Sequence, residues 1–482
     1  MHNDGTLVID SNKVYRAEFW RYEEALAEML IKIREAKPFP THPAALPEGF
    51  TILGHSLTDE QRAAVELACG HKYSIILGPA GSGKTTIINA ICEVVAGNSR
   101  FSSVLCAPTG KAARNLWAKT HREARTIHSA LGSRPNEDFL KPVRWEMIRL
   151  VAVDEASMMD VGMLSGILKQ VSSNPNCRLV MLGDTRQLAS VGPSPGNLLS
   201  FLAEHTEIPS YTLKENHRQS CGSESLLRNI LHFDEIRGVD DLTFDDCFQL
   251  VELDDGAAEC AITREAATRY LRGESVQVLS PRNASGRLSA RELNFRIQDL
   301  VNPMDPRKLS IPFYGRHELR DGDRVMVTMN DRLKDVSNGD IGVLHLRKVW
   351  LQNGGTRNGE APKWHISATI EMEDGRHPEW ILDKDKRLPN TELAYALTVH
   401  KAQGSEYDSV LLAFSQSMGM LRYRNIAYTA ISRARKRIII YGSRAALDVA
   451  LRSDLSPRNC DLLQKYEKRK EQEAEKTLQS AS

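Results

Sequence analysis

Short apolar runs alternate with helical stretches along two parts of the chain. In the first part each run is bounded by turn or helix signals; the runs lie at residues 74–77, 103–106, 150–154 and 178–182. A second series includes residues 276–280, 409–414 and 437–442. Strands of a parallel sheet are covered on both faces, so they read as continuous apolar runs rather than as alternating positions. The pattern therefore predicts two α/β domains, each built on a parallel sheet.

Several segments depart from that alternation. Residues 14–36 have apolar positions near helical spacing and predict a helix, and the four prolines of residues 37–50 indicate a linker. Residues 133–146 interrupt the first series and indicate a small insertion. Between about 320 and 390, alternating positions and a hairpin-type NGD turn indicate a small all-β module inserted into the second α/β domain. Residues 451–482 form a charged tail of helix-like composition, which we expect to be frayed.

Composition places the chain among ordinary globular proteins. At 482 residues it is too long for one compact core, and about three domains are expected. The net charge of +1 provides no global positive field, so any binding of a polyanion must come from local grooves and placed side chains. No stretch approaches the length of about 18 apolar residues that a membrane helix needs, and the start of the chain has no apolar signal region. We therefore expect a soluble, cytoplasmic protein without a membrane partner.

The cysteines indicate neither a disulfide framework nor a metal site. All eight are scattered, with no CxxC pair and no Cys/His ligand spacing. In a chain of this size that pattern is typical of reduced, mostly buried thiols in the cytoplasm.

A glycine-rich loop follows the first apolar run. The sequence GPAGSGKT at 78–85 satisfies the pattern GxxxxGK[ST] and precedes a helical stretch, which is the context that a phosphate-binding loop requires. Its glycines let backbone N–H groups surround a phosphate, and the helix N-terminus adds a favourable dipole. Lys84 is expected to reach the β- and γ-phosphates of ATP, and Thr85 to bind Mg²⁺. The expected ATP-binding residues of the loop are Gly78, Pro79, Ala80, Gly81, Ser82, Gly83, Lys84, Thr85 and Thr86.

Two adjacent carboxylates, Asp154 and Glu155, come at the end of the third apolar run. Burying two carboxylates is costly unless they meet a cation or a partner. Beside a phosphate-binding loop, Asp154 can hold Mg²⁺ and Glu155 can polarise the attacking water. The pair therefore predicts hydrolysis of the nucleotide and not merely its binding.

A short helix start precedes the loop at LTDEQ, residues 57–61. The structural interpretation, Thr58 as the N-cap of a helix, is favoured by the residues alone. The alternative is functional, because the amide of Gln61 could pair with N6 and N7 of adenine.

Further polar stretches follow the apolar runs at regular places. They are APTGKAA (107–113), GDTRQLASVGP (183–193), LKENHRQ (213–219), YALTVHKAQGSEYDSV (395–410) and YTAISRARK (428–436). Together with the loop and the acidic pair, in this order and spacing, they resemble the motifs of superfamily 1 helicases. VDEASMMD, TIHSAL, VHKAQGSE and YTAISRA are similar to the 1B branch, the RecD-like and Dda-like group. The resemblance covers roughly residues 50–445.

The resemblance implies an α/β fold with two RecA-like P-loop domains, an SH3-like β module called 2B and a short pin called 1B. ATP would lie at the cleft of the two domains, and single-stranded DNA would run across both. The implied organisation is an N-terminal helix and proline-rich linker at 1–50, domain 1A at 51–205 with the pin at about 133–146, domain 2A at 206–319 and 391–450, domain 2B at 320–390, and the tail at 451–482.

The resemblance also implies roles for single residues. Gln61 would read adenine, Gln187 would sense the γ-phosphate, and Arg218 and Arg433 would act as arginine fingers, since a guanidinium can bridge phosphate oxygens. The turn at 395–410 would place two residues near the nucleotide, Gly404 and Glu406. Expected DNA contacts are Thr109, Lys111, His128, Thr398 and His400. A lone histidine such as His128 is more often packed in the protein than bound to a ligand.

Some aromatic residues and one substitution leave alternatives open. Phe139 or Trp145 could serve as the wedge of the pin. We expect the three tryptophans of the β module to lie in its core and not on a DNA-stacking surface (350, 364 and 380). Ala189 replaces a proline that members of the branch often carry, which bears on how hydrolysis is coupled to DNA movement.

The predicted function is an ATP-driven helicase that moves 5′→3′ on single-stranded DNA, with the direction implied by resemblance alone. Expected partners are single-stranded DNA, single-strand/double-strand junctions, and repair or replication proteins. The alternative is a DNA-stimulated ATPase or translocase subunit that separates no strands itself. A P-loop kinase would have no use for residues 395–436. RNA is also open as a track, because no residue visibly senses a 2′-hydroxyl.

Overall fold

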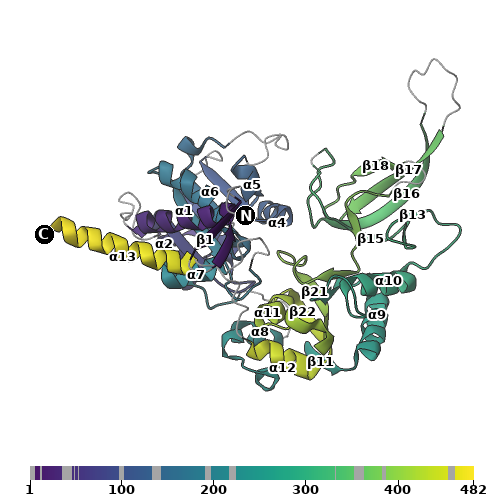
Figure 1. The fold of residues 1–482 in the computed structure, drawn as a ribbon. Helices are drawn as coiled ribbons and strands as arrows, with labels where there is room; N and C mark the ends of the chain where they lie inside the picture. The colour runs from purple at the N-terminus through teal and green to yellow at the C-terminus, as the bar shows by residue number, and fades with distance from the viewer. Residues whose placement is uncertain are drawn as a thin grey trace, which may run out of the picture. The chain divides into compact units, whose positions relative to one another are not determined.

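The chain folds into two compact units (Figure 1). Unit 1 is residues 1–219 and 455–482, and unit 2 is residues 220–454. The structure, a computed structural model, describes residues 6–10, 13–34, 46–47, 49–52, 54–96, 102–132, 143–189, 197–216, 224–331, 333–351, 363–382, 387–453 and 462–481. Within these ranges, no helix is both long and apolar enough to cross a membrane.

Unit 1 is built on a six-stranded parallel sheet in the order β10-β5-β9-β8-β6-β7. The strands are β5 (Tyr73–Leu77), β6 (Ser103–Ala107), β7 (Ala124–Thr126), β8 (Leu150–Val153), β9 (Arg178–Gly183) and β10 (Ser210–Thr212). The four strands predicted from apolar runs are confirmed. The edge strands β7 and β10 were not predicted, because three partly polar residues carry no clear strand pattern. Strand β10 also extends this sheet beyond the expected boundary at residue 205.

Helices cover both faces of this sheet. They are α2 (Asp59–Gly70), α3 (Lys84–Ala96), α4 (Gly110–Thr120), α5 (Ile127–Ala130), α6 (Val161–Ser173) and α7 (Leu198–His205). Val151 and Leu179 are paired across the sheet and belong to the core cluster that includes α6 and α7. Leu150 and Val180 belong to the opposite cluster, with α2 and α3. Successive residues of each strand therefore face different helical layers, as a doubly covered sheet requires.

The first and last helices of the described chain pack together in unit 1 (Figure 1). Helix α1 (Ala17–Arg34) confirms the predicted helix but begins later, because β1 (Leu7–Asp10) and β2 (Lys13–Arg16) form a hairpin. Helix α13 (Leu462–Ala481) lies in the segment expected to be a frayed tail, and that prediction is wrong for its first turns. Leu462 and Tyr466, four residues apart on one helical face, are buried in the same core cluster as α1. Residues 35–36 of the predicted helix and residues 37–45 of the expected linker lie outside the described ranges. The hairpin of β3 (Thr51–Ile52) and β4 (His55–Ser56) follows the linker.

Unit 2 contains a five-stranded parallel sheet in the order β11-β22-β21-β12-β20. Its strands are β11 (Phe248–Glu252), β12 (Val276–Ser280), β20 (Ala396–Thr398), β21 (Tyr407–Phe414) and β22 (Ala434–Gly442). Its helices are α8 (Glu224–Leu231), α9 (Asp255–Leu271), α10 (Ala290–Val301), α11 (Arg424–Ile431) and α12 (Arg444–Arg452). The second predicted series of strands is therefore confirmed, and the fold is two α/β units of the RecA-like kind.

A small antiparallel module is inserted between α10 and β20 of unit 2 (Figure 1). Its strands are β15 (Arg324–Val327), β16 (Ile341–Leu351), β17 (Lys363–Met372), β18 (Glu379–Leu382) and β19 (Thr391–Leu393), in the order β18-β17-β16-β15-β19. The hairpin of β13 (Ser310–Pro312) and β14 (Glu318–Arg320) precedes it. Trp380 packs against the hydrophobic core, as predicted. The side chains of Trp350 and Trp364 lie outside the described part of the structure.

Candidate functional site

The glycine-rich loop connects the end of β5 to the start of α3. Gly81 and Gly83 have φ values of 90° and 83°, in the left-handed region that residues with a Cβ rarely adopt. At Gly78 the restriction is space, because a Cβ there would lie 2.6 Å from Ser82 Oγ and 3.1 Å from Leu213 Cβ. Ser82 is buried, and its hydroxyl donates to the Pro79 carbonyl at 2.9 Å. The loop conformation thus depends on the particular residues of the motif.

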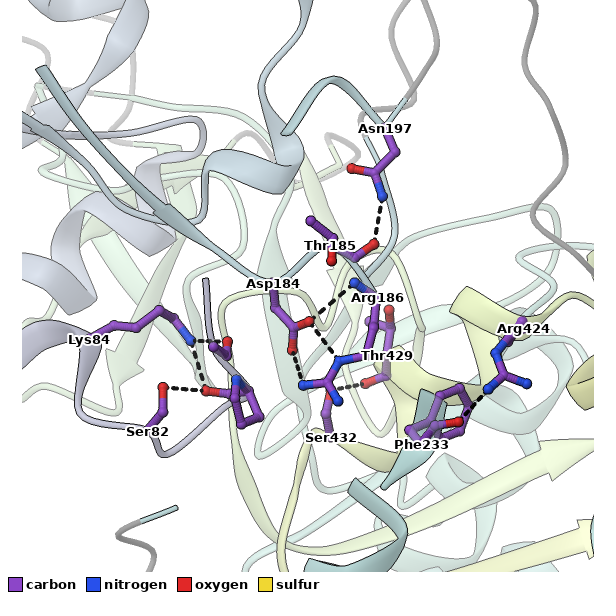
Figure 2. A network of polar contacts seen from close by, with 12 residues as sticks. Ser82, Lys84, Asp184, Thr185, Arg186, Asn197, Phe233, Arg424, Thr429 and Ser432 are labelled. Atoms are coloured by element: carbon purple, nitrogen blue, oxygen red, sulfur yellow. Dashed lines mark hydrogen bonds and ion pairs between the residues drawn. The ribbon is translucent and has the colours of Figure 1, made fainter. Parts of the chain in front are cut away.

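Lys84 is the first residue of α3 and turns its ammonium group back over the loop (Figure 2). Its Nζ donates to the carbonyl oxygens of Gly78 at 2.7 Å and Pro79 at 2.8 Å. Charge-assisted bonds to phosphate oxygens are stronger than bonds to neutral carbonyls, so a phosphate in the loop would supply a better acceptor for the same ammonium. Thr85 and Thr86 lie half-buried in the first helical turn, where the N–H groups have no partners within the helix. The loop therefore fits a nucleotide phosphate.

The order of the strands brings the acidic pair next to this loop. Strand β9 lies between β5 and β8, and all three are parallel, so their carboxyl ends share one edge of the sheet. Leu77 pairs with Gly183, and Val153 pairs with Met181. Neighbouring strands are about 4.8 Å apart, so the loop after β5 and Asp154 after β8 are about 10 Å apart across the sheet. The structure thus brings together residues that are some seventy positions apart in sequence.

Glu155 has a conformation that is unusual for a residue with a side chain. Its φ of 51° and ψ of 40° lie in the left-handed region, and its N–H donates to Asp154 Oδ1 at 2.9 Å. Such strained residues are concentrated at functional sites. The 3₁₀ turn that follows, Ala156–Met158, contacts β9 closely: a Cβ on Gly183 would lie 3.2 Å from Ser157 N. The turn that directly follows the acidic pair is therefore packed against the strand that leads to Gln187.

The segment after β9 is stabilised by an ion pair between the buried Asp184 and the half-buried Arg186 (Figure 2). Asp184 Oδ1 accepts hydrogen bonds from Arg186 N at 3.1 Å and from Arg186 Nε at 3.0 Å. Gln187 is buried, and its N–H donates to the Asp184 carbonyl at 3.1 Å. The predicted γ-phosphate sensor Gln187 thus lies at the same sheet edge as the loop and the acidic pair. Residues 190–193 of this motif lie outside the described ranges.

Gln61 has a structural role that the sequence already suggested. Thr58 caps α2, and its side chain accepts from Gln61 N at 3.4 Å. The amide oxygen of Gln61 in turn accepts from Thr58 N at 3.2 Å, which completes a capping box. The N-cap interpretation is therefore confirmed. A carbonyl oxygen has two lone pairs, so this bond still leaves the amide able to pair with adenine.

The DNA candidates of unit 1 lie at the carboxyl ends of β6 and β7, on the sheet edge that also carries the phosphate-binding loop. Thr109 is the N-cap of α4, and its hydroxyl accepts from Ala112 N at 3.2 Å. Lys111 is half-buried in the first turn of that helix. His128 is exposed on α5 and is therefore not a packed histidine. Thr126, the N-cap of α5, lies at the same edge and was not singled out from the sequence.

The candidates of unit 2 lie in the turn after β20. Thr398 is buried, and its hydroxyl accepts from Lys401 N at 3.2 Å. His400 is half-buried, and Gly404 has a φ of 73°. Glu406 forms an ion pair with Arg435 at 3.2 Å. The turn thus places Thr398 and His400 at the carboxyl edge of the parallel sheet of unit 2.

Arg433 follows α11 and is only 2% exposed. Its guanidinium donates to the Thr429 carbonyl at 3.1 Å, the Ser405 carbonyl at 3.2 Å and the Ser432 hydroxyl at 3.1 Å. Ser432 itself donates to Thr429 O at 3.0 Å (Figure 2). All three acceptors of the guanidinium are neutral, so its positive charge meets no carboxylate among the described residues. The other predicted arginine finger, Arg218, lies outside them.

A connection between the loop and the segment before Arg218 was missed by the sequence analysis. The carboxylate of Glu60 accepts from Lys214 N at 2.8 Å and from Glu215 N at 2.9 Å. Asn216 Nδ2 donates to the carbonyl of Ala80 within the phosphate-binding loop at 2.9 Å. The partners are more than a hundred residues apart, so no local pattern could indicate these bonds.

The two wedge candidates of the expected pin differ in what the structure describes. Trp145 begins a 3₁₀ turn, Trp145–Met147, and packs against the hydrophobic core of unit 1. Its carbonyl accepts from Asn174 Nδ2 at 2.8 Å. This packing favours a structural role for Trp145. Phe139 lies outside the described ranges.

Three domain families match parts of the chain. Residues 56–244 match the AAA domain, and residues 393–441 match the UvrD-like helicase C-terminal domain. Residues 293–348 match the SH3 domain of ATP-dependent RecD-like DNA helicases, a range that runs from α10 into β16 and so includes the first part of the antiparallel module.

Known proteins match most of the chain. The ATP-dependent RecD2 DNA helicase of Deinococcus radiodurans is 32% identical over 464 residues, which are 94% of this chain and 58% of that protein. The RecBCD enzyme subunit RecD of Mycobacterium tuberculosis is 26% identical, over 92% of this chain and 78% of the subunit. A crystal structure of the Pif1 helicase from Candida albicans has the same fold, with a TM-score of 0.51, 19% identity, and coverage of 81% of this chain and 95% of that one. The chain thus spans little more than half the length of its RecD2 relative.

Proposed function

We propose that this chain is a helicase of the RecD-like branch of superfamily 1B, an ATP-dependent DNA helicase that moves 5′→3′ on single-stranded DNA. Its similarity to the SH3 domain of RecD-like helicases and to the RecD2 helicase supports this proposal. One observation carries the proposal. The sheet of unit 1 collects the phosphate-binding loop, the acidic pair and Gln187 on three neighbouring strand ends. Ligands of parallel α/β folds bind at this edge, and the three elements together suit hydrolysis and not binding alone.

ATP, with Mg²⁺, supplies the phosphoanhydride bond whose hydrolysis drives movement. In this proposal the loop N–H groups and Lys84 hold the phosphates, and Thr85 and Asp154 hold the metal ion. Glu155 orients the attacking water and accepts its proton. General-base catalysis of this kind typically raises the rate about 10²–10⁴-fold. Gln187 responds to the γ-phosphate. Gln61 contacts adenine through the amide that also caps α2.

In the same proposal, Arg433, Arg218, Gly404 and Glu406 complete the nucleotide site. Arg433 suits this role because its guanidinium is already oriented by neutral acceptors and pairs with no carboxylate among the residues that the structure describes. Exchanging a carbonyl for a phosphate oxygen would strengthen its hydrogen bonds.

The proposed DNA contacts are Thr109, Lys111, His128, Thr398 and His400. They lie at the carboxyl edges of the two parallel sheets, where hydroxyl, imidazole and ammonium groups can contact phosphates without reading sequence. Residues 133–146 would separate the strands at a junction. Repair or replication proteins are proposed as partners, in keeping with the RecD subunit named among the relatives.

The test is unwinding of matched duplexes that carry either a 5′ or a 3′ single-stranded tail, with ATP and Mg²⁺. We expect the 5′-tailed duplex alone to open. Lys84→Ala should abolish unwinding and ATP hydrolysis, whereas Lys119→Ala, which removes an exposed lysine from α4 of the same unit, should preserve both.

Other outcomes would correct the proposal in distinct ways. Opening of only the 3′-tailed duplex would reverse the polarity. ATP hydrolysis that DNA stimulates, with neither duplex opened, would favour a translocase that works within a larger complex. Stimulation of ATP hydrolysis by RNA and not by DNA would show that the protein moves on RNA.

A further inference from the structure

Unit 2 contains a pocket of about 230 Å³ at the carboxyl edge of its parallel sheet. The ends of β12 and β20 are adjacent there, since Ser280 pairs with Thr398. Helix α10 forms one side of the pocket, and the hairpin loop between β13 and β14 forms the other. Thr398, one of the proposed DNA contacts, is itself part of the lining.

Phe295 and Asn294 of α10 form the floor of the pocket, and both side chains are buried. Phe295 is buried, and its ring stacks on His317 with 3.5 Å between centroids and an angle of 2°. Asn294 ties α10 to the sheet, because its amide donates to Ala396 O at 2.7 Å and accepts from Ala396 N at 2.8 Å. The amide of Asn294 therefore fixes the position of the floor, and both of its polar atoms are engaged by Ala396. A preformed floor of this kind favours a flat apolar surface over a charged group.

The mouth of the pocket combines an aromatic ring with a cation. Tyr314, in the hairpin loop, is 51% exposed. The guanidinium of Arg291 lies over its ring, 4.5 Å from Cζ to the centroid, and donates to its hydroxyl at 3.2 Å. An aromatic ring and a planar guanidinium are the groups on which nucleobases stack in single-strand-binding proteins.

The charged groups at the rim of the pocket suit a nucleic acid strand whose phosphates remain outside the pocket. Lys401 forms an ion pair with Glu392 at 2.5 Å, and Arg291 adds a further positive charge. Lys401, Arg291 and Glu392 together carry a net charge of +1. This charge favours one backbone phosphate lying beside the mouth of the pocket. The carboxylate of Glu392 disfavours the concentrated charge of a nucleoside triphosphate. Asn283, exposed three residues after the end of β12, offers an amide donor and acceptor that suit the edge of a base.

We propose that this pocket holds one nucleobase of the bound single strand, turned out of the stack of its neighbours. Tyr314 and Arg291 provide the stacking surface, Phe295 the floor, and Asn283 a polar contact at the base edge. This inference rests on the proposed function, because it takes single-stranded DNA as the ligand. It adds a grip on a base to the phosphate contact at Thr398.

The experiment compares two ligands of equal length and charge: an oligothymidylate and a strand with the same backbone in which every base is absent. Their dissociation constants for the full chain are measured by fluorescence anisotropy without nucleotide. For Tyr314→Ala we expect binding of oligothymidylate to weaken about 5- to 150-fold, the range for losing one stacked base. Binding of the abasic strand should change less than about twofold. Tyr314→Phe should behave as the wild type, because it keeps the ring.

A second pair of variants separates stacking from charge. Arg291→Ala should weaken oligothymidylate more than the abasic strand. Arg296→Ala, which removes a charge from the same helix on a side chain that pairs with Glu259 at 3.2 Å, should weaken both equally or neither. Because Tyr314 and Arg296 are well exposed, these changes remove little buried surface, and thermal unfolding checks that the variants fold.

The outcomes distinguish this inference from the proposed function. If Tyr314→Ala weakens the binding of both ligands equally, or of neither, the base pocket is overturned. Unwinding in the 5′→3′ direction by the wild type would still support the proposed function. If the wild type neither binds single-stranded DNA nor hydrolyses ATP, the proposed function itself fails.

Discussion

At the scale of single residues, the glycines of the phosphate-binding loop are required for two different physical reasons. Gly81 and Gly83 provide positive φ angles, whereas Gly78 provides space beside Ser82 and Leu213. The second reason leads to a test, because a single methyl group there should disturb the loop without altering any charged group.

We expect Gly78→Ala to force Ser82 out of its hydrogen bond to Pro79 and to displace the loop. The added methyl group should lower the free energy of unfolding by about 1–3 kcal/mol. A displacement of about 1 Å at the phosphates should slow ATP hydrolysis about 100-fold. Thermal unfolding and steady-state hydrolysis measure the two effects.

Gly70→Ala is the matched control. A Cβ at Gly70 would meet no atom within 4 Å, and its φ is not in the left-handed region. This variant should keep wild-type activity. If Gly78→Ala also hydrolyses ATP at the wild-type rate, the loop has more room than these distances imply.

The residues of the loop and the acidic pair could be predicted because each motif is local in sequence. The contacts of Glu60 and Asn216 could not, because their partners lie at positions 214 and 80, far along the chain. The neutral surroundings of Arg433 were equally hidden, since they depend on how α11 and the turn at Ser405 meet. Sequence motifs thus identify chemical groups, whereas their orientation comes from long-range packing.

At the scale of elements, α13 shows how a charged sequence can still form a specific contact. Lys465 and Glu23 are each 6% exposed and pair at 2.9 Å between α13 and α1. The ammonium also lies 5.1 Å from the ring centroids of Tyr15 and Trp20. Composition alone suggested fraying, because the apolar stripe of this helix is narrow.

Lys465→Met should therefore destabilise unit 1. It keeps the apolar stem but removes the cation of a buried ion pair, which costs about 3–5 kcal/mol. The double variant Lys465→Met/Glu23→Gln should recover most of that loss, because neither member of the pair is then charged. Urea unfolding measures both, and Lys468→Met, at an exposed position of the same helix, should be nearly neutral. Equal stability of Lys465→Met and wild type would show that this ion pair does not hold α13 in place.

Burial also determines which thiols can react. The pKa of Cys69 is raised to about 12 by burial, as is that of Cys106, while Cys260 is exposed. Thiolates are the reactive form, so a raised pKa and a buried sulfur both slow alkylation. Peptide mapping after iodoacetamide treatment at pH 8 should find Cys260 modified in the folded protein, and Cys69 and Cys106 modified only after unfolding. Early labelling of Cys106 would contradict the packing of the first sheet.

At the scale of the whole molecule, the chain enters unit 2 once and returns to unit 1, since residues 455–482 belong with residues 1–219. The two parallel sheets and the inserted module were predicted from periodicity, because each contributes several strands with consistent patterns. The return of the chain was not, because it depends on the burial of Leu462 and Tyr466 against a helix more than four hundred residues earlier. The junction of the module with the sheet of unit 2 was also not predicted.

That junction is polar and buried. Asp323, which is 0% exposed, accepts hydrogen bonds from Gln298 Nε2 of α10 at 2.6 Å and from Nδ2 of Asn302, the C-cap of that helix, at 2.8 Å. It also accepts from Arg320 N at 2.7 Å and from the Tyr395 hydroxyl at 3.1 Å. One carboxylate thus joins the helix before the module to the segment that leaves it, and so holds the module on unit 2.

Asp323→Asn should loosen this junction, because the amide keeps one acceptor and turns its NH₂ towards donors. A donor left without an acceptor costs about 1–3 kcal/mol, measurable as a lower unfolding free energy at pH 7. Unwinding per ATP hydrolysed should fall more than hydrolysis itself, since the module carries no residue of the nucleotide site. Asp374→Asn, at an exposed position of the module, is the control.

The stability difference between wild type and Asp323→Asn should also depend on pH. Burial raises the pKa of Asp323 above 3.8, so between 3.8 and the folded value the folded state binds more protons than the unfolded state. The contribution of this group to stability therefore falls as pH rises through that window and recovers as pH falls. Asparagine does not titrate. The advantage of wild type over Asp323→Asn should consequently grow when unfolding is measured at pH 4 instead of pH 7. A shrinking advantage would mean that the four donors, and not burial, control the ionisation of Asp323, and that the junction is stabilised by its charge.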